Sequence, residues 1–419
     1  MKIALISEHA SPLATLGSID SGGQNVYVAY VARELAQAGH SVDVFTRRNN
    51  PELPPVIYFA RNVRVIPVPA GPACFIPKES LLPHMDEFSD NIVTCCGRAR
   101  PYDVIHANFF MSGVAAQRLR DEYGSPFVIT FHALGKVRRL HQGSADGFPA
   151  SRIDIEEMLV ASADRIIAAC PQDRDDLVNL YDARLDDVDV VPCGVETKEL
   201  GPGSRKLRKE LGIGDDEFVV LQLGRLVPRK GIDNVIRGLA TLVTDHRIEA
   251  KLLVVGGESD EPDPVRTPEI GRLHRIAEAE GVGARVIFIG RRPRTALRDF
   301  YCAADVFVTT PWHEPFGITP LEAMACGCPV VGAAVGGIKH TVVDGVTGYL
   351  IPPNDPSALA DRLACLRSNP ARARMFGRAG VRRVRSAFTW QRVAASLESV
   401  YRSLYSGPEI RFDQRMVRL

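Results

Sequence analysis

Residues 314–322 read Glu-Pro-Phe-Gly-Ile-Thr-Pro-Leu-Glu and place two carboxylates eight positions apart across a predicted strand-to-helix junction. The preceding run at 306–309 is apolar and β-branched, which predicts a strand, and a helical pattern covers 321–326 before a glycine. A helix N-terminus presents unpaired N–H groups and partial positive charge. The backbone of residues 316–318 is therefore expected to bind an anion such as a diphosphate.

The two carboxylates of this segment differ in their position relative to the predicted helix. Glu314 is expected on the loop before the helix, and Glu322 about a turn or more inside it. A carboxylate accepts hydrogen bonds from two hydroxyl groups, which is what a sugar ring or a ribose offers. An isolated pair of this kind is more often the charged first turn of a capped helix, so the surrounding sequence decides between these interpretations.

A second anion-binding junction is predicted earlier in the chain. Residues 224–231 read Gly-Arg-Leu-Val-Pro-Arg-Lys-Gly and follow directly after an apolar strand predicted at 218–223. Arg225 can bind phosphate oxygens through a planar fork of N–H groups, and Lys230 can bind them as a compact charge. Either residue alone is more often a solvated surface cation. Together with residues 314–322, the pair favours a phosphate site.

Length and periodicity predict two α/β domains with doubly wound parallel sheets. A chain of 419 residues is too long for one ordinary core, and apolar runs alternate with helical patterns in both halves. Strands are expected at 2–6, 41–45, 63–67, 104–106, 127–130, 165–169 and 188–191, and then at 218–223, 251–255, 286–288, 306–309 and 330–332. Two such sheets imply a cleft between two domains.

Domain boundaries are predicted from the distribution of turn-forming residues. Proline, glycine and serine accumulate near 192–203, before a charged helical segment. We predict a first domain at 1–195 and a second at 196–388. The segment 389–419 follows a helix break at Phe388-Thr389-Trp390 and is predicted to contain a last helix.

Composition excludes several classes of protein. A formal charge of +1 gives no overall attraction to nucleic acid. The sequence shows no apolar run of transmembrane length and no signal peptide, so neither is expected. Nine scattered cysteines without C-x-x-C spacing predict reduced thiols in the cytoplasm and no zinc site.

The loop after the first predicted strand contains adjacent glycines. Residues 18–25 read Ser-Ile-Asp-Ser-Gly-Gly-Gln-Asn and precede a helix that ends near Gly39. Adjacent glycines allow close approach of a ligand to the backbone, and the helix behind them offers free N–H groups. The G-x-G-x-x-G spacing of a dinucleotide dehydrogenase is absent, which makes that interpretation poor.

One histidine is expected at the carboxyl edge of the first sheet. His132 follows the strand at 127–130, and ligands collect at the carboxyl ends of strands in open α/β sheets. A lone histidine at such a place is usually structural. His132 is kept as a candidate because of its position.

The order and spacing of these segments resemble the retaining GT-B glycosyltransferases of family 4 (glycosyl transferase group 1) along nearly the whole chain. The resemblance implies a GT-B fold, a nucleotide-sugar donor, and a last helix that crosses back onto the N-terminal domain. It implies donor binding by Gly22, Gly23, Arg225, Lys230, Arg291, Glu314, Phe316, Gly317, Ile318, Thr319 and Glu322, and catalysis by His132, Glu314, Arg225 and Lys230. UDP is favoured by analogy, with ADP and GDP left open.

The resemblance also implies acceptor residues in the N-terminal half. Residues just after the glycines face the acceptor in the family, which indicates Gln24 and Asn25, although an N-cap role is about as probable for Asn25. Lys78, Lys136 and Arg152 suggest a phosphorylated acceptor, as in the sucrose-phosphate synthases and the inositol-phosphate N-acetylglucosaminyltransferases, while each alone is most simply a surface cation.

Two features distinguish between these acceptors. At Asn108-Phe109-Phe110 the inositol-phosphate enzymes have a tyrosine hydroxyl that faces the acceptor, and phenylalanine cannot provide that hydrogen bond. The run Asp20-Ser21-Gly22-Gly23-Gln24 looks closer to the sucrose-phosphate synthases.

These features predict transfer of glucose from UDP-glucose to fructose 6-phosphate with retention. The alternatives are a lipid-linked, polysaccharide or inositol-phosphate acceptor, a nucleotide-sugar epimerase, or a non-catalytic binding protein. No cofactor or metal is expected, because no clear D-x-D motif stands at a strand end. The leaving diphosphate would be stabilised by Arg225, Lys230 and the helix N-terminus instead.

One basic segment lies outside this site. Residues Arg367 to Arg385 contain seven arginines and no acidic residue. A solvated polar helix face is the simplest interpretation. A membrane-surface or assembly patch is the alternative, and the oligomeric state is left open.

Overall fold

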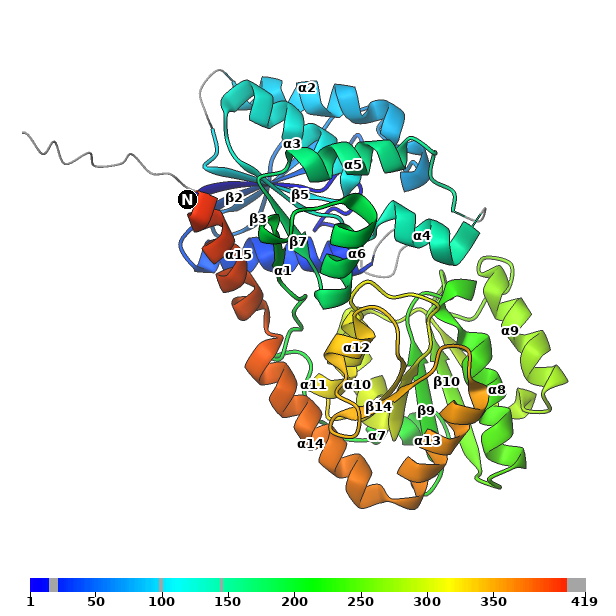
Figure 1. Cartoon of the computed structure of the whole chain (residues 1–419). Helices are drawn as coiled ribbons and strands as arrows, with labels where there is room; N and C mark the ends of the chain where they lie inside the picture. The colour runs from blue at the N-terminus through cyan, green and yellow to red at the C-terminus, as the bar shows by residue number, and fades with distance from the viewer. Residues whose placement is uncertain (15–21, 98–100, 144–145, 405–419) are drawn as a thin grey trace, which may run out of the picture.

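The structure is a computed structural model that describes residues 1–14, 22–97, 101–143 and 146–404. Two α/β domains are stacked, and the chain passes between them at the segment after β8 and again before α15 (Figure 1). The predicted fold class is confirmed, because each domain contains its own largely parallel sheet covered by helices. Residues 18–21 of the predicted glycine loop and residues 405–419 lie outside the described part.

The N-terminal domain is built on an eight-stranded sheet with the order β3-β4-β2-β1-β5-β6-β7-β8. All neighbouring strands are parallel except the edge pair β3 and β4. The strands are β1 (Lys2–Ile6), β2 (Ser41–Arg47), β3 (Ile57–Ala60), β4 (Val63–Val68), β5 (Val104–Asn108), β6 (Phe127–Thr130), β7 (Arg165–Ala168) and β8 (Val188–Val190). The helices are α1 (Gly23–Gln37), α2 (Met85–Cys96), α3 (Phe110–Tyr123), α4 (Gly135–Gln142), α5 (Arg152–Ser162) and α6 (Pro171–Tyr181).

The C-terminal domain repeats this architecture with a six-stranded parallel sheet in the order β11-β10-β9-β12-β13-β14. Its strands are β9 (Phe218–Leu223), β10 (Ala250–Val255), β11 (Val286–Gly290), β12 (Val306–Thr309), β13 (Val330–Ala333) and β14 (Gly348–Ile351). Its helices are α7 (Lys206–Glu210), α8 (Ile232–Thr244), α9 (Pro268–Ala279), α10 (Arg294–Ala303), α11 (Ile318–Ala325), α12 (Ile338–Thr341), α13 (Pro356–Ser368) and α14 (Pro370–Ala387).

The predicted strands are all present, with ends shifted by one or two residues. Two edge strands were not predicted, β3 in the first sheet and β14 in the second. β3 is a four-residue strand that pairs only with β4, in antiparallel orientation and with an irregular register. Short edge strands have little hydrophobic pattern, because only one neighbour and one face constrain their side chains.

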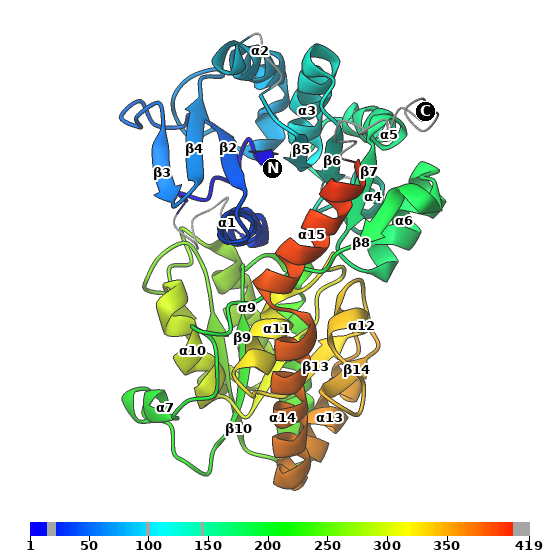
Figure 2. The ribbon, with the colours of Figure 1, turned by 90° about the vertical axis from the view of Figure 1, so that its left-hand side faces the viewer.

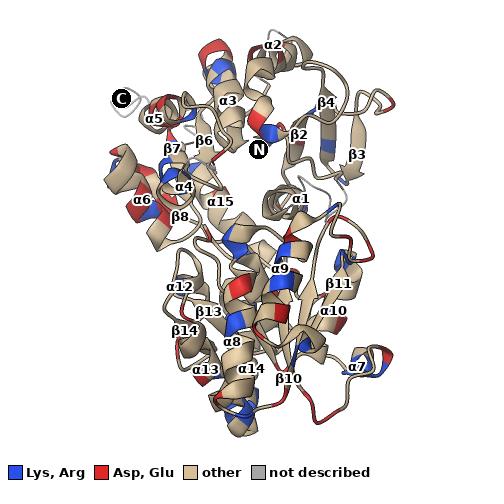
Figure 3. Cartoon of the chain, turned by 90° about the vertical axis from the view of Figure 1, so that its right-hand side faces the viewer, with Lys and Arg blue, Asp and Glu red and all other residues tan. Residues whose placement is uncertain are grey.

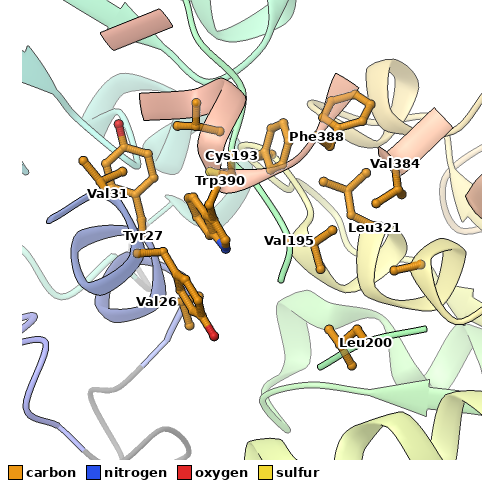
Figure 4. Close-up of a cluster of buried hydrophobic side chains, with 14 of the residues drawn as sticks. Val26, Tyr27, Val31, Cys193, Val195, Leu200, Leu321, Val384, Phe388 and Trp390 are labelled. Carbon is orange, nitrogen blue, oxygen red and sulfur yellow. The ribbon is translucent and has the colours of Figure 1, made fainter. Parts of the chain in front are cut away.

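The last helix, α15 (Trp390–Leu404), leaves the C-terminal domain and packs on α1. Figure 2 shows α14 and α15 as one path along the surface that spans both domains. The Trp390 ring stacks on the Tyr30 ring with 5.3 Å between centroids, and the Val195 N–H donates to the Phe388 carbonyl at 2.8 Å. The junction is therefore fixed by a continuous apolar cluster, in which Trp390 and Phe388 lie between side chains of both domains (Figure 4).

Charged residues of both signs are distributed over both domains (Figure 3). This distribution agrees with the formal charge of +1. No helix within the described residues is long and apolar enough to cross a membrane. The described residues also contain no group of His, Cys, Asp and Glu side chains arranged to hold a metal ion.

Candidate active site

The helix expected in residues 314–322 is α11, and the role of its N-terminus as an anion site remains a prediction. Gly317 adopts φ 88°, a conformation that favours glycine, and no side chain caps the helix. The preceding loop rests on a second pair of glycines: Gly337 N–H donates to the Glu314 carbonyl at 2.9 Å, and a Cβ on Gly336 would lie 2.0 Å from that oxygen. The N–H groups of the first turn of α11 are thus free for a ligand.

Glu314 forms an ion pair with Lys230 across this edge of the sheet. Each side chain is only 18% exposed, so the pair lies at the bottom of the site. Burial by itself would raise the pKa of Glu314, but Lys230 and Arg229 lower it below its ordinary value. Glu314 is therefore a carboxylate at neutral pH, and the neighbouring cations hold it in this state.

The loop after β9 carries more positive charge than Glu314 can balance. Burial lowers the pKa of Lys230 and of Arg229, and repulsion from the nearby Arg225 lowers both further. Arg225 is exposed and makes no hydrogen bond or ion pair with any described residue. This excess of positive charge faces the helix N-terminus and suits a diphosphate. Arg229 was not among the predicted site residues, although it lies in the same motif.

Glu322 is 3% exposed and is held from two sides. Its Oε1 accepts a hydrogen bond from Arg294 Nη1 at 2.8 Å, and its Oε2 accepts one from the Tyr301 hydroxyl at 2.9 Å. Arg294 also stacks over the Tyr30 ring of α1, 5.7 Å from its centre. Glu322 is therefore oriented by α10 and, through Arg294, is coupled to the N-terminal domain. Neither partner could be identified from the sequence, because both contacts join segments distant in the chain.

The predicted glycines lie opposite the N-terminus of α11. Gly23 begins α1 and is exposed, and a Cβ added to it would lie 3.3 Å from Ile318 Cδ1 of the C-terminal domain. A larger residue would narrow this gap between the domains. Asn25 is 2% exposed and accepts from the Gly22 N–H at 2.9 Å. The N-cap of α1 is Gly22, so Asn25 is not the N-cap itself but the third helical residue, which bonds back to the cap. Gln24 donates to the Asn108 carbonyl at 3.0 Å.

His132 stands at the carboxyl end of β6 with a backbone φ of 59°, which is uncommon outside glycine. Its Nε2 lies 3.0 Å from Asn108 Oδ1, and its ring packs edge-on against Tyr27 at 5.0 Å. Burial, with smaller contributions from His106 and His9, lowers the pKa of His132 to about 3. The imidazole is therefore neutral at physiological pH and acts as a hydrogen-bonding group.

A second histidine, His9, lies near His132 and was missed by the sequence analysis. Its Nδ1 is 2.6 Å from Glu8 Oε1, and the buried Glu8 carboxylate also accepts a hydrogen bond from Ser112. The His9 ring packs edge-on against Phe109, with 5.0 Å between centroids. The described residues provide no partner for Nε2. Glu8 and His9 come directly after β1, and a polar pair at a strand end is the only signal for them in the sequence.

Arg152 is buried, so the simple interpretation as a surface cation is wrong. Its side chain is 1% exposed, and its Nε donates to Glu156 Oε1 at 2.7 Å. Three phenylalanine rings surround the guanidinium at 4.5 to 4.9 Å, namely Phe109, Phe110 and Phe148. Its Nη1 has no hydrogen-bond partner among the described residues.

Glu156 completes a network that the sequence analysis did not find. Besides Arg152, its carboxylate accepts from the Gly135 N–H at 2.8 Å and from the Tyr181 hydroxyl. Burial and the charge of Glu156 raise the pKa of Tyr181 well above its ordinary value, so Tyr181 remains a donor. This network connects α5 and α6 to the loop that follows His132.

Three further charged residues were predicted for the site, namely Lys136, Lys78 and Arg291. The Lys136 ammonium pairs with Glu157 at 2.6 Å and lies over the Tyr181 ring. Lys78 begins a short 3-10 turn, and its ammonium is 3.8 Å from Glu79 Oε1. Arg291 follows β11 and pairs with Asp260 at 3.1 Å, while its backbone N–H donates to the Ser259 carbonyl at 2.8 Å. The roles of Lys78, Lys136 and Arg291 toward a ligand remain predictions.

The fold and this set of cations, carboxylates and a neutral histidine agree with the predicted class of nucleotide-sugar transferases, and comparisons with known proteins identify the family. The model of the glycosyl transferases group 1 matches residues 203–383, and that of glycosyltransferase family 4 matches residues 21–199. The chain belongs to glycosyltransferase family 4, as the motifs predict, and is a glycosyltransferase that uses nucleotide-sugar donors.

Individual relatives match over nearly the whole chain. The D-inositol 3-phosphate glycosyltransferase of Acidothermus cellulolyticus is 37% identical over 99% of this chain and 93% of that protein. The enzyme of the same name from Actinosynnema mirum is 38% identical over 96% of each. Among solved structures, the sucrose-phosphate synthase of Thermosynechococcus elongatus is 34% identical with a TM-score of 0.87, covering 96% of this chain and 99% of that one.

Proposed function

We propose that this chain transfers glucose from UDP-glucose to a sugar phosphate, with fructose 6-phosphate as the leading acceptor and with retention at the anomeric carbon. One observation carries the choice of a phosphorylated acceptor. The buried Arg152 guanidinium is paired with Glu156, and its Nη1 has no hydrogen-bond partner among the described residues. A buried N–H group without a partner is costly, and a phosphate oxygen would complete its hydrogen bonds.

The donor would bind between the loops at residues 224–231 and 314–322 of the C-terminal domain. The diphosphate would lie against the N-terminus of α11 with Arg225 and Lys230 on its other side, and Glu314 would accept hydrogen bonds from sugar hydroxyls. As the glycosidic bond breaks, negative charge develops on the diphosphate. Cations already fixed in place stabilise that charge without reorganisation, which lowers the barrier for transfer.

Two of the predicted catalytic residues are poorly suited to remove the acceptor proton. With a pKa of about 3, His132 is too weakly basic to remove a proton at neutral pH, and Glu314 is already paired with Lys230. This supports a same-face reaction in which an oxygen of the leaving diphosphate takes the acceptor proton. His132 would then position a hydroxyl of the transferred sugar rather than act as the base.

We assign the acceptor side of the cleft to His9 as well. Glu8 fixes the orientation of the His9 ring through Nδ1, and the edge-on contact with Phe109 restricts it further. Nε2 is then available to a hydroxyl of the acceptor. The role proposed for His9 is positioning of that hydroxyl against the sugar carbon.

A second candidate acceptor is an inositol phosphate. It is favoured by the names of the relatives that are 37% and 38% identical to this chain. Phe109 argues against it, because its ring is 5% exposed, packs between His9 and Phe148, and has no hydroxyl for the acceptor. A lipid-linked or polysaccharide acceptor would leave the Arg152 site without a ligand, and an epimerase would need no acceptor.

The test is release of UDP from UDP-glucose and UDP-N-acetylglucosamine, with ADP-glucose and GDP-mannose as alternative donors. Each donor is offered alone, with fructose 6-phosphate, and with inositol 3-phosphate. Release from UDP-glucose that depends on fructose 6-phosphate supports the proposal. Release that depends on inositol phosphate supports the second candidate, and donor-dependent release with neither sugar phosphate contradicts both.

A further inference from the structure

Helix α14 carries a basic face that takes no part in the site described above. The helix covers Pro370–Ala387, and the chain has no acidic residue between Asp361 and Glu398. Figure 2 shows α14 at the surface of the C-terminal domain, and α9 lies on the opposite side of that domain (Figure 1).

The seven arginines of this segment divide into two groups. Three of them are bonded to the protein: Arg367 to the Asp216 carbonyl at 3.0 Å, Arg372 to the Tyr349 hydroxyl at 3.1 Å, and Arg383 to the Thr341 carbonyl at 3.0 Å. The other four are exposed and have no hydrogen bond or ion pair with any described residue, namely Arg374, Arg378, Arg382 and Arg385. We call these four the outer arginine row.

The outer arginine row follows one side of the helix. Its members are three or four positions apart, which places them on one face over about 16 Å at the usual rise of ~1.5 Å per residue. Three of the four border a hollow of 370 Å³, which is lined by Ala371, Arg374, Met375, Arg378 and Arg382. Met375 is 53% exposed and lies within the row.

The inner face of α14 holds the row rigidly. Phe376 and Val384 are buried in the core, and a Cβ on Gly377 would lie 2.1 Å from the Gly327 carbonyl. The helix therefore cannot turn to bring the arginines toward acidic partners within the described protein. Four guanidinium groups remain in water at fixed spacing, and repulsion among them favours an external anion.

We propose that the outer arginine row docks the protein on an anionic lipid surface. Lipid phosphates can spread along a straight row of charges and enter the hollow, and a cationic face with an apolar side chain is the pattern of interfacial helices. A single-stranded nucleic acid site would be expected to add exposed aromatic rings, and the one aromatic residue of α14, Phe376, is 1% exposed.

The test is co-sedimentation with vesicles of phosphatidylglycerol and phosphatidylcholine in equal parts, and with vesicles of phosphatidylcholine alone. The protein is expected to bind the anionic vesicles only, and less at high salt, because exposed charges are screened. The variant R374Q/R378Q/R382Q is expected to bind about a hundredfold more weakly, since each arginine near such a surface contributes about a fivefold factor.

A matched control variant removes the same number of positive charges from other parts of the protein surface. The variant R184Q/R266Q/R402Q changes exposed arginines, each paired to a neighbouring acid, with side chains 82%, 70% and 65% exposed. It should bind vesicles like the wild type, and both variants should keep the wild-type thermal midpoint and UDP affinity. Equal binding by both variants, or tighter binding of DNA or polyglutamate than of vesicles, overturns the proposal. The outcome is independent of which acceptor the enzyme uses.

Discussion

The two domains have the same fold but present their ligand-binding residues in different ways. In the C-terminal domain, Arg225, Lys230 and Glu314 lie on two short loops at strand ends, and Lys230 and Glu314 meet directly. In the N-terminal domain, Arg152 and His9 are each held by a buried carboxylate, Glu156 and Glu8. The proposed donor side therefore has one ion pair, Lys230 with Glu314, and a further cation, Arg225, without a partner among the described residues. On the proposed acceptor side, each of the two side chains is held by a buried carboxylate.

The difference implies different consequences of mutation. On the proposed donor side, Glu314 has two cationic neighbours, Lys230 and Arg229. Removing one of them leaves the other beside the carboxylate, so catalysis should be affected more than folding. Removing a member of a buried pair on the acceptor side leaves a charge without a partner, which destabilises the domain as well. Four experiments test this contrast, in order of decreasing effect.

The largest effect is expected from Glu156→Gln. The change leaves the Arg152 guanidinium, 1% exposed, without its charge partner, which should lower the free energy of unfolding by about 3–5 kcal/mol. The control is Glu157→Gln on the same helix, whose side chain is 48% exposed and pairs with Lys136, and which should cost less than about 1 kcal/mol. Denaturant unfolding gives both values, and equal losses would contradict the buried-pair argument.

Acidification is expected to weaken the N-terminal domain. His106 and His132 are neutral in the folded protein because burial lowers the pKa of each to about 3, below the ordinary value near 6.5. Between these values the unfolded chain binds protons that the folded chain does not, so stability falls as pH decreases from about 6.5 toward 3, by about 1 kcal/mol per pH unit for each histidine.

Hydrogen exchange followed by mass spectrometry locates this loss. Peptides from β5 and β6 should lose protection between pH 6.5 and pH 5, and His132→Phe should reduce the pH dependence of that loss. Loss of protection confined to the C-terminal sheet would show that the acid-sensitive groups have been misplaced.

Lys230→Met should mainly affect catalysis. It removes a charge-assisted contact to the diphosphate worth about 1.5–3 kcal/mol, so kcat/KM for the donor should fall about tenfold to a hundredfold. The loss of stability should be smaller than for Glu156→Gln, because Arg229 remains beside the Glu314 carboxylate. Lys251→Met, which breaks a pair with Glu217 at 2.9 Å, is the control and should leave donor use unchanged. Unaltered kinetics in the Lys230 variant would contradict the assignment of Lys230 to the donor site.

The smallest effect is expected from His9→Phe, which keeps an aromatic ring beside Phe109 but removes both ring nitrogens. KM for the acceptor should rise about tenfold, the effect of one hydrogen bond of about 1.4 kcal/mol, while UDP affinity stays constant. His274→Phe, at a ring that packs on Phe288 at 4.3 Å, is the matched control. A change in UDP affinity alone would place His9 on the donor side.

The sequence predicted the fold and grouped the candidate donor residues on two loops, because both inferences depend on local pattern. Alternating apolar runs specify the parallel sheets, and the loops at 224–231 and 314–322 combine glycine, cations and carboxylates within a few positions. The buried carboxylates that hold the proposed acceptor residues could not be predicted from local pattern. Glu8 and Glu156 look like ordinary charged residues in sequence, and only the packing of β1, α3 and α5 buries them. Arg294 was missed for the same reason, because its contact with Glu322 joins separate helices.

The most direct test of a separate phosphate site on the N-terminal domain compares fructose 6-phosphate with fructose as acceptors for the wild type and for Arg152→Lys. The wild type should prefer the phosphorylated sugar by about a hundredfold or more, because a buried guanidinium binds phosphate in a geometry that fructose cannot use. Arg152→Lys should lose most of this preference while UDP affinity is unchanged. An equal preference in both proteins, or a loss of UDP affinity in the variant, would contradict the assignment of the two anions to the two domains.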